Sequence, residues 1–157
     1  MGRSPAPIFQ NDSTGYIGLN PVELRYRGTH EANLRHVLSE IETLYGTDHC
    51  EYRHKLKNLG ALMIDQGRYK SAEETSRRLI SITPNVHSKN RNDMYDALDL
   101  LGKALLHQGL FSQSEKLFRQ TFTARRKAQG SEHPDTLISQ GNLASTYREE
   151  GRYIEAN

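Results

Sequence analysis

Apolar residues recur at helical spacing along the chain from residue 30 onward. In residues 30–45 they are spaced by three and four positions, which places them on one side of a helix and predicts a helix over 30–45. The predicted inward face consists of Leu34, Val37, Leu38, Ile41, Leu44 and Tyr45. Gly46 is expected to end this helix, because glycine readily adopts the left-handed conformation found after helix ends. Thr47 or Asp48 is expected to cap the next helix.

The same spacing predicts further helices, each closed by a glycine or a proline. They cover residues 51–66, 69–82, 93–108 with Asp93 as N-cap, 111–129, and Pro134 to the residue before Gly151. The glycines that stop them are Gly67, Gly109, Gly130 and Gly151, and Pro84 prevents the second of these helices from continuing. The predicted order is therefore helix, tight glycine turn, helix and a longer link, repeated along the chain.

Small residues mark a repeat of 42 residues. The turn glycines Gly67, Gly109 and Gly151 follow this interval, and so do Gly60, Gly102 and Ala144 inside the preceding helices. A glycine inside a helix costs about 1 kcal/mol relative to alanine, so its recurrence indicates that a neighbouring helix approaches closely there. A period of this length is typical of stacked helical repeats, in which each unit packs only against its neighbours.

Several motifs match at this interval. Each repeat has a Leu-Gly or Leu-Ala pair, then the turn glycine, then an aromatic residue two positions later. The clearest match is Gly130-Ser-Glu-His-Pro-Asp-Thr-Leu137, followed by Asn142-Leu-Ala-Ser-Thr-Tyr147 and Gly151-Arg-Tyr-Ile-Glu-Ala156. These features resemble the tetratricopeptide repeat, in the longer form of kinesin light chains. The resemblance implies an all-α fold, a tetratricopeptide-like right-handed superhelix of antiparallel helix pairs.

Two segments are expected. Residues 1–29 are rich in Gly, Pro, Ser and Asn without lasting periodicity, which predicts a flexible N-terminal tail. Residues 30–157 form the predicted tetratricopeptide-like array, which is cut inside its last repeat. Ser76 and Ser114 depart from the family pattern. The family usually has a large residue in the place of Ser76 and alanine in the place of Ser114.

Charge and composition narrow the function classes. The 157 residues include 21 basic and 19 acidic ones, a net charge of +2, so no strong field draws the chain to nucleic acid or to a membrane surface. The basic runs Arg77-Arg78 and Arg125-Arg126-Lys127 fall late in predicted helices, and we interpret them as solvated helix ends that complement the helix dipole rather than as a polyanion site. Cys50 is the only cysteine, no apolar run is long enough to cross a membrane, and a cytoplasmic location is expected.

Candidate chemistry is sparse. His49, Cys50 and His54 lie close in sequence but fit no usual zinc spacing, and His49 has a repeat counterpart in His133. No nucleophile–base pairing or phosphate-binding glycine loop is evident. We therefore predict no metal, no cofactor and no enzymatic activity.

The resemblance does imply a binding face. In the family the first helix of each pair lines a concave groove that receives an extended peptide, and an asparagine before the Leu-Ala pair hydrogen-bonds the peptide backbone. That register holds Asn58, Leu100 and Asn142, so leucine interrupts the asparagine series. The predicted peptide-groove residues are Asn58, Asn142, Lys57, Lys103, His107 and Arg148, with Ala61, Asp99 and Ser145 on the same face.

Two functions fit this pattern. The first is a non-catalytic protein–protein interaction module, a scaffold or adaptor that binds a peptide segment or partner helix in the groove. The alternative is a structural self-assembly unit whose open repeat ends stack on another copy, which would make the chain a homo-oligomer. The sequence leaves the identity and charge pattern of the ligand open.

Overall fold

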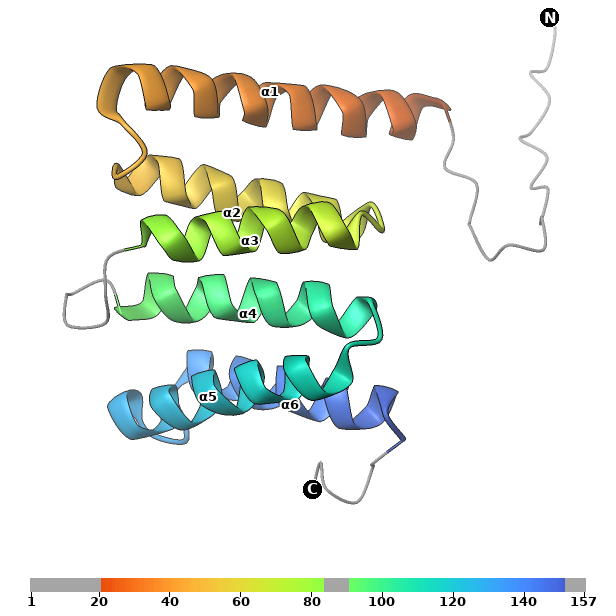
Figure 1. The fold of residues 1–157 in the computed structure, drawn as a ribbon, viewed down its shortest axis with the longest axis vertical. Coiled ribbons are helices and arrows are strands. Elements are labelled where there is room, and N and C mark those ends of the chain that lie inside the picture. The colour runs from red at the N-terminus through yellow and green to blue at the C-terminus, as the bar shows by residue number, and fades with distance from the viewer. Residues whose placement is uncertain (1–20, 84–90, 152–157) are drawn as a thin grey trace, which may run out of the picture.

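The structure, a computed structural model, describes residues 21–83 and 91–151. Within these ranges the chain forms six α-helices: α1 (Pro21–Tyr45), α2 (Cys50–Asp65), α3 (Tyr69–Ile82), α4 (Arg91–His107), α5 (Phe111–Gln129) and α6 (Pro134–Glu149). Figure 1 shows the helices following one another down the molecule, with α6 behind α5. Each helix packs against the next along the chain, which confirms the predicted all-α arrangement of antiparallel pairs.

The turn glycines have the predicted role. Gly67 and Gly109 have φ angles of 73° and 76°, in the left-handed region that L side chains disfavour. The Arg68 N–H reaches back to the Met63 carbonyl at 2.8 Å, and the Leu110 N–H reaches the Leu105 carbonyl at 3.0 Å. These bonds satisfy carbonyls at the ends of α2 and α4 that the helices leave open, so each helix reverses into the next within a few residues.

The start of α1 differs from the prediction. The helix was expected to begin at residue 30 but begins at Pro21, so residues 21–29 belong to it rather than to the predicted tail. Proline suits a first helical turn, because its missing N–H would have no helical partner there. Gly28 lies inside the helix and lowers its stability by about 1 kcal/mol without ending it. Residues 1–20 of the predicted tail lie outside the described residues.

The end of α1 also differs. Leu44 and Tyr45 were expected on the inward face, but they are 70% and 64% exposed. Leu34 and Leu38 are buried as predicted, so the packed part of α1 ends before its last turn. The Tyr45 ring instead stacks on His49, with ring centroids 4.9 Å apart.

Histidines cap the N-termini of α2 and α6. The expected cap of α2, Thr47 or Asp48, is wrong: His49 is the N-cap, and its Nδ1 accepts a hydrogen bond from the Glu51 N–H at 3.3 Å. His133 caps α6 in the same way through the Asp135 N–H at 3.2 Å. The two histidines are separated by two repeat periods, and the equivalent position between them is Arg91, so two of the three repeats share this cap. The predicted N-cap Asp93 lies inside the first turn of α4.

The small-residue register marks close packing, as predicted. A Cβ atom added to Gly102 would lie 2.6 Å from the Phe118 ring, and one added to Gly60 would lie 2.6 Å from a Leu100 methyl group. The two glycines are equivalent in the repeat, but different helices cover them. Phe118 comes from the partner helix α5 of the same pair, whereas Leu100 comes from α4 of the next pair.

A series of ion pairs identifies α1 as a second helix of the repeat. Glutamate and arginine pair one turn apart in α1, α3 and α5, at 2.9, 2.7 and 2.6 Å. The pairs are Glu31–Arg35, Glu73–Arg77 and Glu115–Arg119, spaced by the 42-residue period. Each glutamate also meets a side chain beyond its own helix: Arg68, Gln108 or Tyr147, respectively. The repeat register therefore extends to α1.

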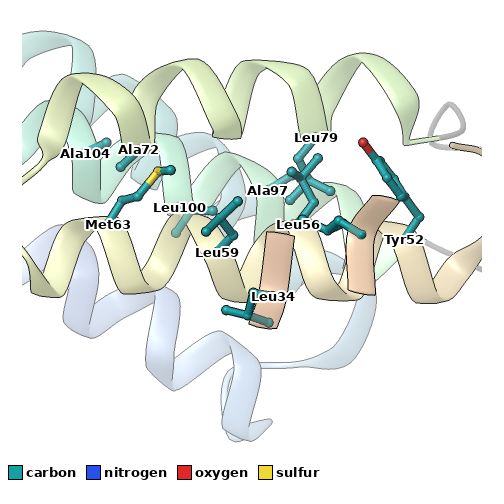
Figure 2. Close-up of a cluster of buried hydrophobic side chains, with 11 residues drawn as sticks. Leu34, Tyr52, Leu56, Leu59, Met63, Ala72, Leu79, Ala97, Leu100 and Ala104 are labelled. Atoms are coloured by element: carbon teal, nitrogen blue, oxygen red, sulfur yellow. The ribbon is translucent and has the colours of Figure 1, made fainter. Parts of the chain in front are cut away.

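The main core lies between α1, α2, α3 and α4. Figure 2 shows Leu56 of α2 near Leu79 of α3 toward one end of the cluster and Met63 near Ala72 toward the other, with Leu59 and Leu100 between them. Burial of these aliphatic side chains stabilises the stack by roughly 1.5–3 kcal/mol each. The core fixes α2 against α4, and these two helices form the centre of the site described below.

Candidate functional site

The first helices of the pairs, α2, α4 and α6, lie next to one another and form one face of the stack, called here the first-helix face. A cleft of about 230 Å³ opens between them. Its lining consists of Lys57, Asn58, Ala61, Asp96, Asp99, Leu100, Lys103, Arg125, Asp135 and Ile138. The structure thus brings together three predicted groove residues, Lys57, Asn58 and Lys103, from two consecutive repeats. We call this the central cleft.

An ion pair crosses the face. The Lys57 Nζ of α2 lies 2.8 Å from an Asp96 carboxylate oxygen of α4, and the two side chains are 36% and 38% exposed. Because both partners remain in contact with water, the pair contributes little to stability, on the order of 0–1 kcal/mol. Its effect is positional, since it holds Lys57 across the cleft.

Arg125 supports the floor of the central cleft from below. Its side chain is only 2% exposed, although it belongs to a basic run that we interpreted as solvated. The guanidinium donates to Asp96 at 2.8 Å and also to Asp99 and Ser139, and it lies over the Tyr95 ring. Arg125 therefore links α5 to both α4 and α6, so the solvated interpretation is wrong for this residue.

The repeat register is the signal that could have located Arg125. Counting back by one and two periods leads to Thr83 and Ile41, which are buried and partly buried. An arginine at an inward position needs carboxylate partners, and two aspartates with suitable spacing occur in α4. The adjacent residues Arg126 and Lys127 are exposed, as predicted.

Asp99 was expected on the groove face, but its side chain turns into the interior. The residue is 7% exposed, and its carboxylate accepts from the Thr121 hydroxyl at 2.8 Å and from Arg125. Burial raises the pKa of this carboxyl above its usual range, and the charge of Arg125 and the hydrogen bonds from Thr121 and Arg125 only partly oppose that effect. Asp99 therefore acts as the buried counter-ion of Arg125 and not as a surface ligand group.

Leu100 interrupts the asparagine series for a packing reason. It is 6% exposed and its methyl group contacts Gly60, so it fills space inside the stack. In the next repeat Phe118 covers the equivalent glycine, but the residue one period before Phe118 is Ser76. A serine is too small to cover Gly60, and Leu100 takes that place.

The other predicted groove residues lie away from the central cleft. His107 is exposed at the end of α4 and stacks on Tyr69, with ring centroids 5.0 Å apart. Arg148 is exposed on α6, and the residues one and two repeat periods before it are Leu106 and Ile64. Asn142 is partly buried, and among the described residues its amide nitrogen has no hydrogen-bond partner.

The histidines and the lone cysteine do not converge. Among residues 21–83 and 91–151 no group of three metal-ligating side chains lies close enough to hold an ion. Within the same ranges no helix is long and apolar enough to cross a bilayer.

Comparison with known proteins fits this geometry. The tetratricopeptide repeat family model matches residues 93–157. The chain is 30% identical over 98 residues to Protein KINESIN LIGHT CHAIN-RELATED 2 of Arabidopsis thaliana, a match that covers 62% of this chain and 15% of that protein. The chain therefore spans a small part of that relative's length.

Solved structures give the same fold. Two crystal structures of kinesin light chain nearly identical TPR-like repeats from Podosopora anserina, one of them of a single-residue variant, superpose with TM-scores of 0.69 and 0.68. They share 21% and 20% identity with this chain, cover 86% of it, and are themselves covered over 66% and 64% of their length. Such repeats belong to a typically non-catalytic family whose domains are generally protein-interaction modules. Residues 93–157 therefore match the tetratricopeptide repeat family, and the helix pairs of the chain resemble the repeats of kinesin light chains.

Proposed function

We propose that the chain is a non-catalytic scaffold or adaptor module that binds an extended peptide segment of a partner protein across the first-helix face. The observation that carries the proposal is the convergence of Asn58, Lys57 and Lys103 on one cleft, beside the 55% exposed side chain of Ile138. An exposed aliphatic side chain next to polar groups is the usual composition of a recognition surface.

Each side chain has a distinct recognition chemistry. The Asn58 amide offers both a donor and an acceptor to a peptide unit. Lys103 lies near the buried Asp99 charge and offers its ammonium group to an acidic side chain or a terminal carboxylate of the ligand. Ile138 supplies an apolar contact at the edge of the cleft. The cleft is smaller than a typical small-molecule pocket of roughly 300–1,000 Å³, so it fits one or two side chains of a peptide better than a drug-sized ligand.

Neither a cofactor nor a catalytic group is part of this proposal, and the module is placed in the cytoplasm.

The test is peptide binding by a face variant. Peptides are selected from a random twelve-residue library on the wild-type protein, and their affinities are then measured by fluorescence polarisation. Combining Asn58→Ala with Lys103→Ala should weaken binding by about tenfold or more, because both substitutions remove groups from the cleft. The matched control Lys116→Ala, an exposed lysine of the second helix α5, should leave the affinity unchanged. Equal affinities for the two variants would exclude the first-helix face as the binding surface.

A second candidate is self-assembly, in which another copy stacks on the exposed side of α6. Leu137 favours it, because this apolar side chain is 49% exposed and stands one period after Tyr95, which is 7% exposed against the next helices. A second copy would cover Leu137 as the following helices cover Tyr95.

A further inference from the structure

A second cleft adjoins the central one on the first-helix face. It has a volume of about 240 Å³ and lies between the N-terminal halves of α2 and α4. Its lining consists of Cys50, Glu51, Arg53, His54, Lys57, Leu79, Asp93 and Asp96. Both clefts include Lys57 and Asp96, so the Lys57–Asp96 ion pair stands where they meet and divides the face into two compartments. We call this second compartment the N-terminal cleft.

The cations of the N-terminal cleft are already engaged. Arg53 is only 5% exposed; its guanidinium donates to the Asp48 carbonyl and lies 3.8 Å from the Asp93 carboxylate. Lys57 is held by Asp96. Both cations are therefore already partly neutralised by carboxylates of α4.

The carboxylates outnumber these cations. Within the lining, Glu51, Asp93 and Asp96 face the two cations Arg53 and Lys57. Asp96 is compensated by Lys57 and by the buried Arg125, which it shares with Asp99, so Glu51 and Asp93 are left with Arg53 alone. Glu51 and Asp93 are exposed, so a ligand can approach their oxygens from solvent. An acidic side chain would meet the exposed like charges of Glu51 and Asp93, and Leu79 is the only aliphatic side chain in the lining that an apolar group could contact.

We propose that the N-terminal cleft receives a basic side chain, lysine or arginine, of the peptide bound on this face. The inference rests on the proposed function and adds a charge requirement to it. An arginine suits the site especially well, because its planar group can bond a carboxylate through two nitrogens at once. The Lys57–Asp96 pair keeps this side chain apart from the residue that contacts Lys103 and Ile138.

The spacing of the two clefts sets the spacing in the ligand. On α2 the lining shifts from Cys50–Lys57 to Lys57–Ala61, and the midpoints of these ranges differ by about five residues or about 8 Å along the helix axis. An extended peptide covers this length in about two residues. The basic residue is therefore expected about two positions from the apolar residue that occupies the central cleft.

The experiment uses synthetic fluorescein-labelled octapeptides of Gly and Ser that carry one leucine, with Arg, Gln or Glu two positions before or after it. For one of the two directions the Arg peptide should bind the wild-type protein about tenfold more tightly than the Gln peptide, and the Glu peptide should bind most weakly. The variant Asp93→Asn should remove the preference for Arg over Gln. The control Glu74→Gln, an exposed carboxylate of α3 outside the lining of both clefts, should retain it, and circular dichroism melts verify that both variants fold.

The outcomes separate the two proposals. Equal binding of the Arg and Gln peptides, with both weakened by Asn58→Ala and Lys103→Ala, would overturn the charge requirement and leave the peptide-binding function standing. A preference for Glu, or an Arg preference that survives Asp93→Asn, would also overturn it. If no octapeptide binds and the random library yields no binder, the proposed function fails, and this inference fails with it.

Discussion

At the scale of single residues, the most consequential side chain is Arg125. It is almost completely buried, and its partners Asp96 and Asp99 belong to another helix. Taking a charge out of water is costly unless a partner compensates it, so each member of this cluster depends on the others. The cluster lies directly beneath the central cleft, which links the stability of the stack to the shape of that cleft.

Replacing Arg125 by methionine should therefore be strongly destabilising. The change Arg125→Met leaves the Asp99 carboxylate buried without its cation, and the free energy of unfolding should fall by about 3–5 kcal/mol. Urea unfolding followed by circular dichroism measures the difference. Lys116→Met, an exposed change in the same helix, should alter the value by no more than about 0.5 kcal/mol. Similar small losses for both variants would mean that the Arg125 cluster contributes little.

At the scale of helices, much of the structure could be predicted from spacing and turn residues. The bounds of α3 and α5 agree with the expected ranges, because a turn glycine precedes each helix and its apolar stripe persists to the end. The start of α1 was missed because residues 21–29 lack a regular apolar stripe, and only a proline marks the beginning. The cap of α2 was missed because histidine is a less common cap than the neighbouring threonine and aspartate.

The candidate site was predictable only in part, for a related reason. Asn58, Lys57 and Lys103 follow from the repeat register, which states which face a residue occupies. The Lys57–Asp96 pair joins residues far apart in sequence, and the inward turn of Asp99 depends on an arginine from a different helix. Such contacts depend on how helices cross, and the spacing of residues along one helix carries no information about that.

Two glycines allow a test with opposite signs at this scale. Gly109 has a φ angle of 76° at the end of α4, so Gly109→Ala should lower the free energy of unfolding by about 1–2 kcal/mol. Gly141 lies inside α6, and an added Cβ atom would meet nothing within 4 Å there. Gly141→Ala should therefore raise the free energy of unfolding by about 0.5–1 kcal/mol. Thermal melts of both variants provide the comparison, and a shift in the same direction for both would contradict the assigned turn geometry.

At the scale of the whole molecule, each repeat unit within the described residues contacts only the neighbouring units. The helices pack in chain order, and the glutamate–arginine pairs of α1, α3 and α5 each reach one step along the stack. In such a stack each repeat adds a similar strip of surface. The outer side of a terminal helix pair therefore resembles the sides that inner pairs bury against one another.

The self-assembly candidate predicts a specific mass dependence. If a second copy covers the exposed side of α6, the molar mass measured by light scattering should rise with protein concentration. Leu137→Glu should keep the protein monomeric, because a charge would then have to be buried at the contact. Its matched control Leu110→Glu, at an exposed site between α4 and α5 in the middle of the stack, should behave like wild type. A constant monomer mass for the wild-type protein at all concentrations would exclude stacking.

The contact between Leu100 and Gly60 has an evolutionary consequence. The leucine occupies the place that an aromatic side chain at position 76 would fill, so the identities at positions 76 and 100 are not independent. Homologous chains with a bulky residue at position 76 are then free to carry asparagine at position 100, which would complete the asparagine series of Asn58 and Asn142. Covariation of positions 76 and 100 in an alignment would record how a change in packing adds or removes an asparagine on the first-helix face.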